Sequence, residues 1–149
     1  MTSPVRNNLV VELHVPDFAP IRGFYGKLGF EIISEKLKTV EHPGYLVMQL
    51  KGDIGNTIIN FYGDDERVFN QSYFKQFPRD TIRGYAIEMT IPVADVDAIY
   101  KLAIEKLTKH VVKPLQETKD EKWTWRDFRM ADPYGYYIRI TELLDWGQE

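Results

Sequence analysis

The sequence contains no cysteine, which excludes disulfides, thiolate metal sites and cysteine nucleophiles. It has no apolar run near the roughly 20 residues that a membrane-spanning helix needs, so no membrane partner is expected. Basic residues are dispersed among acidic ones at a formal net charge of −3, and this predicts no nucleic-acid surface. Residues 1–8 are polar, a pattern that predicts no signal peptide, and we expect a cytoplasmic protein.

What is present fits an ordinary globular chain. Its 149 residues include 44% hydrophobic and 28% charged side chains, enough to bury a core in one domain or in two small packed halves. Aromatic residues make up 13% of the chain, a share that can serve either a core or the walls of a pocket. The order of the segments helps to decide between these uses.

The first half of the chain predicts a strand, a helix and then three strands. Apolar and polar residues alternate over residues 9–15, as in a strand with one face on a core. Apolar residues then recur at helical spacing from Ile21 to Leu28, and Gly29 is a suitable helix end. Three further short apolar runs read as strands: residues 30–33, 45–50 and 57–62.

The same pattern restarts after residues 63–83, which read as a polar linker with a short helix. We expect the aromatic side chains of residues 68–77 to act as a lid or to pack in an interface. The predicted elements of the second half are a strand over 85–91, a helix over 95–109, and strands over 111–115, 123–130 and 136–141. The shift between the halves is about 75 to 79 residues, and an internal repeat of this kind weighs more than any single propensity.

The repeat predicts the fold class. It is α+β, with two βαβββ modules over residues 8–62 and 84–142, the linker between them and a C-terminal tail over 143–149. Placed side by side, the modules would form a curved mixed sheet with the helices on its convex side and an open trough on the other.

Two segments carry a resemblance to a known superfamily. Residues 14–31 read HVPDFAPIRGFYGKLGFE, and residues 123–142 read WTWRDFRMADPYGYYIRITE. Together they resemble the glyoxalase, bleomycin-resistance and extradiol-dioxygenase proteins, the vicinal-oxygen-chelate superfamily, over residues 9–142. The resemblance implies the paired-module fold and a homodimer.

The resemblance also implies four metal-ligand positions, one on the first and one on the last strand of each module. They fall on Val10, on Asn60, on Gly84 or Tyr85, and on Arg139. Valine and glycine offer no donor, and a guanidinium is charged and has no lone pair to give. We therefore expect no metal and no cofactor.

Strand alternation predicts the side chains that face the trough. Polar residues would form its floor and aromatic residues its walls, as in a site for a flat or extended organic ligand. The predicted ligand-binding residues are Glu12, His14, Asn60, Glu88 and Arg139 on the floor, and Tyr62, Trp123, Trp125 and Tyr137 in the walls.

Three functions remain open at this point. The leading one is a metal-free small-molecule-binding protein, similar to the bleomycin-resistance proteins, that sequesters an aromatic or extended ligand. The resemblance implies an acidic crevice for a cationic drug, but Arg139 favours an aromatic or anionic metabolite equally. The alternative is a lyase, isomerase or dioxygenase of the glyoxalase type, with His14 or Glu12 as a general base and Arg139 stabilising an oxyanion. In the third, Arg139 pairs with Glu12 or Glu88 and fills the trough of a structural module.

Overall fold

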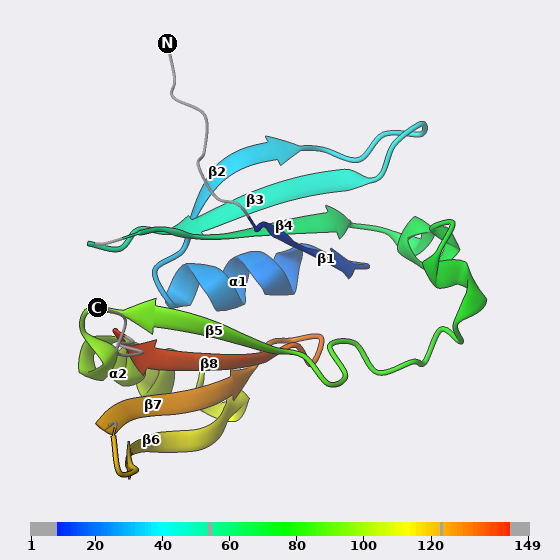
Figure 1. Cartoon of the computed structure of the whole chain (residues 1–149). Helices are drawn as coiled ribbons and strands as arrows, with labels where there is room; N and C mark the ends of the chain where they lie inside the picture. Colours follow the sequence, from blue (N-terminus) through cyan, green and yellow to red (C-terminus); the bar gives the residue numbers. More distant parts are fainter. Residues whose placement is uncertain (1–8, 54, 123, 144–149) are drawn as a thin grey trace.

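The computed structural model describes residues 9–53, 55–122 and 124–143, and within them the order of elements repeats (Figure 1). The first module consists of β1 (Val11–Val15), α1 (Ala19–Lys27), β2 (Glu31–Lys36), β3 (Gly44–Leu50) and β4 (Thr57–Gly63). The second consists of β5 (Glu88–Val93), α2 (Val96–Lys106), the short η3 (Thr108–His110), β6 (Val111–Lys119), β7 (Thr124–Ala131) and β8 (Tyr137–Glu142). The linker carries two short 3-10 turns, η1 (Glu66–Asn70) and η2 (Phe74–Gln76).

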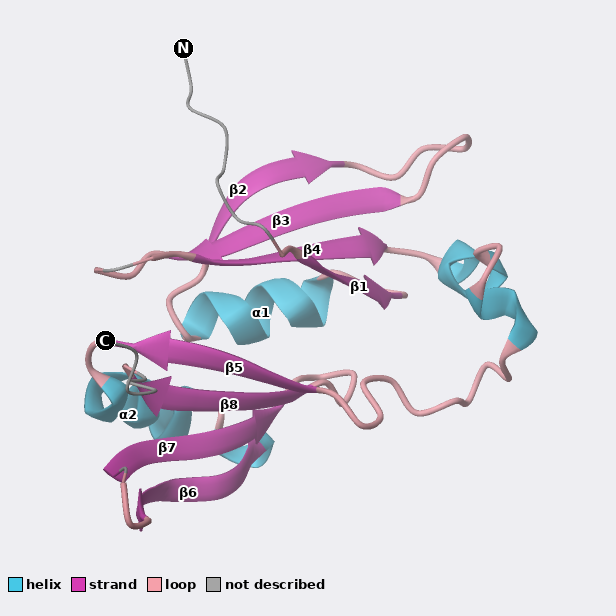
Figure 2. Ribbon diagram, in the orientation of Figure 1, coloured by secondary structure: helices cyan, strands magenta, loops and turns pink. Residues whose placement is uncertain are grey.

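Each module builds one four-stranded mixed sheet. The strand orders are β1-β4-β3-β2 and β5-β8-β7-β6. In both sheets the first strand pairs in parallel with the last, and the other pairs are antiparallel. Figures 1 and 2 show the strands following one another from β2 at the top to β6 at the bottom, with β1 and β5 as the inner edges. The predicted α+β fold of two βαβββ modules is confirmed, as two separate sheets.

One hydrophobic core joins the modules. Alternation turns Leu13 and Val15 of β1 and Phe61 of β4 to the buried face, where α1 covers them with Ile21 and its aromatic residues. Residues of β7 and β8 belong to the same core cluster. None of the described helices is long and apolar enough to cross a membrane.

A buried hydrogen bond connects α1 to the second module. The Tyr25 hydroxyl donates to Asp132 Oδ2 at 2.8 Å, and both side chains are nearly inaccessible to solvent. Backbone N–H groups of Tyr134 and Tyr136 donate to the other oxygen of Asp132. Burial raises the pKa of the Asp132 carboxyl, while these hydrogen bonds lower it in part. Burial likewise raises the pKa of Tyr25 well above its usual value.

Three strands differ from the sequence prediction by three residues or more. β2 runs to Lys36, not to residue 33. β5 begins at Glu88, not at residue 85, because Gly84 and Ala86 adopt positive φ angles of 72° and 62° that an extended strand does not allow. β6 runs to Lys119, not to residue 115. It contains Pro114, which an edge strand tolerates because one side of its backbone needs no partner.

Replacing Tyr25 with phenylalanine tests the connection between the modules. Y25F deletes one hydroxyl that donates in the core, and the free energy of unfolding should fall by about 1 to 2 kcal/mol. Urea denaturation measures this change. The matched control is Y100F: Tyr100 also packs in the core, on Phe128, but its hydroxyl shares no hydrogen bond with another described residue. Equal losses in both variants would show that the bond to Asp132 adds no stability.

Candidate functional site

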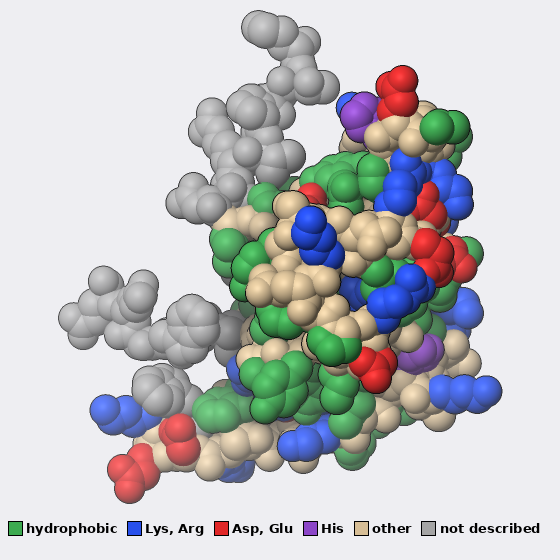
Figure 3. Space-filling model, turned by 90° about the vertical axis from the view of Figure 1, so that its right-hand side faces the viewer, with side chains coloured by type: hydrophobic (Ala, Val, Ile, Leu, Met, Phe, Trp, Pro, Cys, Tyr) green, Lys and Arg blue, Asp and Glu red, His purple; other side chains and the backbone are tan. Residues whose placement is uncertain are grey.

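A pocket of about 490 Å³ lies between the linker and the inner strands of the two modules. Phe69, Phe74 and Phe77 of the linker are among its lining residues, and their role as a lid or in an interface stays a prediction. β1 lines the pocket with His14, and the start of β8 lines it with Tyr137. Figure 3 shows the face that carries the linker, on which hydrophobic side chains lie among both basic and acidic ones.

Glu12 and His14 form a hydrogen-bonded pair on β1. Both point away from the core because Leu13 and Val15 fill it. His14 Nε2 lies 3.0 Å from Glu12 Oε2, and an ionised carboxylate only accepts, so Nε2 donates. The imidazole packs against the Tyr62 ring at 4.6 Å and the Phe74 ring at 5.0 Å. Its Nδ1 is buried without a hydrogen-bond partner among the described residues.

Asn60 extends this polar group on the neighbouring strand. Its Nδ2 donates to the Tyr45 hydroxyl at 2.7 Å. Burial raises the pKa of Tyr45, and interaction with the Glu12 carboxylate raises it further. Asn60 Oδ1, like His14 Nδ1, is buried and unpaired among the described residues. Buried acceptors of this kind usually have a partner, so a ligand or a water suits both positions.

The end of the linker is fastened to β1. Arg83 Nη1 donates to the His14 carbonyl oxygen at 2.5 Å, and the Tyr136 hydroxyl donates to the same oxygen at 3.2 Å. Gly84 follows with its positive φ, and a Cβ there would meet the Tyr136 ring at 2.8 Å, so the close approach needs glycine. Sequence reasoning missed Arg83, because a linker residue has no strand alternation to give its direction.

A second polar cluster lies on the exposed face of the second sheet. Asp127 is fully buried and accepts from Arg129 Nη1 and from Arg139 Nε, each at 2.7 Å. Arg129 Nε also donates to Glu88 at 2.9 Å, and the Arg139 guanidinium lies 5.7 Å from the Trp125 ring centroid. The predicted pairing of Arg139 with Glu12 or Glu88 is therefore wrong: its carboxylate partner is Asp127.

The predicted trough residues divide between the two clusters. Three of them, Glu12, His14 and Tyr137, line the pocket. Tyr62 packs on His14, and Asn60 is the strand partner of Glu12. Glu88, Trp125 and Arg139 belong to the cluster around Asp127, and Trp123 lies outside the described residues. The predicted acid–base group is likewise divided, since Glu12 and His14 pair on β1 while Arg139 is bound to Asp127.

Strand register corrects one of the four metal-ligand positions. Glu12 pairs with Asn60 in the first sheet, as Thr90 pairs with Arg139 in the second. The counterpart of Val10, two residues before Glu12, is therefore Glu88 and not Gly84 or Tyr85.

The corrected set of ligand positions, Val10, Asn60, Glu88 and Arg139, does not suit a divalent cation. It holds one carboxylate, and Arg129 already occupies that carboxylate, while Arg139 adds a positive charge. Within the described part of the chain no three His, Asp or Glu side chains form a metal-binding group.

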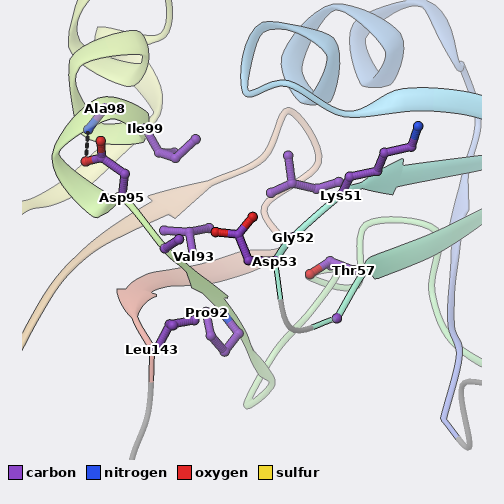
Figure 4. Close-up of a pocket in the computed structure, with 13 residues that line it drawn as sticks. Lys51, Gly52, Asp53, Thr57, Pro92, Val93, Asp95, Ala98, Ile99 and Leu143 are labelled. Atoms are coloured by element: carbon purple, nitrogen blue, oxygen red, sulfur yellow. Dashed lines mark hydrogen bonds between the residues drawn. The ribbon is translucent and has the colours of Figure 1, made fainter.

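A smaller pocket of about 210 Å³ lies at the far end of the inner strands, between the β3–β4 hairpin and the start of α2. In Figure 4 the Asp95 carboxylate turns to the Ala98 N–H that it caps, and Lys51 extends away from Ile99. Asp95 and Lys51 of this smaller pocket therefore do not point toward one common ligand position. The linker pocket is the better candidate site.

No family model and no curated protein matches the sequence. Solved structures do match. A hypothetical protein, SA1046 from S. aureus, has a TM-score of 0.64 at 17% identity, covering 95% of this chain and 96% of that one. A glyoxalase/bleomycin resistance protein/dioxygenase family enzyme from Burkholderia phytofirmans PsJN has a TM-score of 0.62 at 20% identity, covering 91% and 97%. A bleomycin resistance determinant encoded on the transposon Tn5 has a TM-score of 0.56 at 16% identity, covering 91% and 97%. At these identities the matches show the fold.

Replacing Asp127 with asparagine tests the cluster on the second sheet. D127N leaves two mostly buried guanidinium groups without their shared carboxylate, and the free energy of unfolding should fall by about 3 kcal/mol or more. Denaturant unfolding measures the loss. The control D97N breaks the solvent-exposed pair with Arg126 and should cost about 1 kcal/mol at most. A D127N loss no larger than that of D97N would contradict this description.

Proposed function

We propose that this chain, which has the vicinal-oxygen-chelate fold of the glyoxalase and bleomycin-resistance proteins, is a metal-free protein that binds a small aromatic molecule. The proposal rests on the pocket of about 490 Å³ beneath the linker, which has an aromatic lining. His14 lines this pocket, and its buried Nδ1 has no hydrogen-bond partner among the described residues. A ligand that sits there is held between β1 and the linker.

The chemistry of the lining supports a flat organic ligand. Phe69, Phe74 and Phe77 offer ring faces and edges, against which a planar molecule loses little entropy and removes apolar area from water. A hydroxyl or N–H group of the ligand can satisfy His14 Nδ1, which accepts a hydrogen bond when the imidazole is neutral and its Nε2–H donates to Glu12. Sequestration by such a pocket needs no catalytic group.

The donor set at the four superfamily positions supports a metal-free function. Val10 and Arg139 cannot ligate a cation, and Glu88 is engaged by Arg129. That the chain forms a homodimer stays a prediction.

Metal analysis of the purified protein checks the metal-free proposal. We expect substoichiometric nickel, zinc, iron and manganese, and no rise in the unfolding temperature when each ion is added, because a cation with no site in the folded state cannot stabilise it. A bound ion at one equivalent per chain, or a clear thermal shift with any of the four, would refute this part of the proposal.

Replacing Phe74 with alanine tests the location of the binding site. F74A removes a ring that both lines the pocket and packs on His14. Affinity for planar aromatic compounds should fall about tenfold, because one stacking contact contributes about 1 to 3 kcal/mol. Calorimetric titration with a panel of bicyclic aromatic compounds measures this.

W125A is the matched control, since Trp125 lies in the Asp127 cluster. It should leave these affinities within about twofold. If W125A weakens binding and F74A does not, the ligand sits on the second sheet and the linker pocket is the wrong site.

A further inference from the structure

We propose that the pocket selects planar aromatic anions, such as aromatic carboxylates, and that Arg83 is the residue that recognises the anionic group. This inference rests on the proposed function and adds the charge of the ligand. It also replaces Arg139, the cation expected from the sequence, with one in the linker.

The arginines near the two clusters differ in how their charges are balanced. Arg139 and Arg129 share the buried carboxylate of Asp127, and Arg129 also binds Glu88. Arg79 pairs with Glu66. Arg83 differs, because its hydrogen bond goes to the His14 carbonyl oxygen and no carboxylate among the described residues pairs with it. A carbonyl accepts a hydrogen bond but does not neutralise a charge.

The position of Arg83 makes this charge available to a ligand. Its side chain lines the pocket. One N–H donates to the His14 carbonyl oxygen, and the guanidinium carries further N–H donors. A planar guanidinium matches the two oxygens of a carboxylate. The positive charge of Arg83 also acts within the pocket, since it lowers the pKa of the Tyr136 hydroxyl, which burial raises.

A second arginine lies beside the same aromatic ring as Arg83. The guanidinium carbons of Arg79 and Arg83 lie 4.1 Å and 5.1 Å from the centroid of the Phe69 ring. Glu66 already pairs with Arg79, so the charge that an anion can balance here is that of Arg83. Phe69 itself lines the pocket, so the anionic group and an aromatic body of the ligand would meet adjacent parts of one wall.

Glu12 indicates the orientation of such a ligand. It is the carboxylate among the described residues that line the pocket, and it is engaged by His14. An anionic group is repelled from that end, where a neutral hydrogen-bond donor suits His14 Nδ1. The ligand's anionic group therefore belongs at Arg83, and a hydroxyl or amine N–H belongs near the Glu12 side chain.

The test compares 2-naphthoate with 2-naphthamide, two probes of the same shape that differ in charge. Calorimetric titration of the full chain should give an affinity for 2-naphthoate about tenfold or more above that for 2-naphthamide. A charge-assisted hydrogen bond contributes about 1.5 to 3 kcal/mol, which corresponds to roughly 10-fold to 150-fold.

Variants then assign the preference to one residue. R83Q should bring the two affinities together by weakening 2-naphthoate alone, while unchanged 2-naphthamide binding shows that the pocket is intact. R83K keeps the charge without the planar fork and should retain part of the preference. The control R126Q removes an arginine whose pair with Asp97 lies on the protein surface, and it should retain all of the preference.

The outcomes separate this inference from the proposed function. Equal binding of both probes by the native chain would overturn the inference and leave the proposed function standing. A preference for 2-naphthoate that survives R83Q and is lost in R139Q would have the same consequence, because it would assign recognition of the anion to the Asp127 cluster. If neither probe binds the native chain, the proposed function fails, and the inference fails with it.

Discussion

The hydrogen bond from Tyr25 to Asp132 joins the two modules, and the candidate site depends on that junction. Asp132 sits in the turn between β7 and β8, where backbone N–H groups hold one oxygen and Tyr25 of α1 holds the other. A buried carboxylate is costly unless it is fully bonded, so this arrangement specifies one packing of α1 against the second module. In that packing β1 and β5, the inner edges of the two sheets, both contribute residues to the lining of the pocket. The pocket exists because β1, the linker and the start of β8 then enclose one space.

The two polar clusters differ in how completely their groups are satisfied. Around Asp127 the charges alternate, and each carboxylate has an arginine partner. Such a network stabilises this face of the second sheet, and it leaves few hydrogen-bonding groups for a ligand. Around His14, the buried atoms His14 Nδ1 and Asn60 Oδ1 have no hydrogen-bond partner among the described residues, and Arg83 nearby carries a charge that no described carboxylate balances. Unsatisfied groups cost folding energy when no partner binds, so they point to the place where a partner binds.

Much of the fold was predictable from the sequence, since it depends on local patterns. Period-two alternation placed Leu13 and Val15 in the core and Glu12 and His14 on the opposite face. The restart of the pattern after the linker predicted two modules. The prediction failed at residues 84–87, where positive φ angles delay β5 until Glu88. Hydrophobic pattern alone does not reveal those angles, because Tyr85 and Ile87 alternate as a strand would.

The sequence by itself determined the faces of the strands, the repeat and two residues, Val10 and Arg139, that cannot ligate a divalent cation. These follow from residue types and from periodicities that each strand carries alone. Only the tertiary structure decided which polar residues meet, because partners such as Asp127 with Arg139, or Arg83 with the His14 carbonyl, lie on different elements. In the tertiary structure Arg139 belongs to the neutralised network around Asp127 and not to the expected binding group. Arg83 and the aromatic residues of the linker lie close to β1. Contacts between segments distant in the chain arise from the packing of the modules, and strand alternation carries no information about that packing.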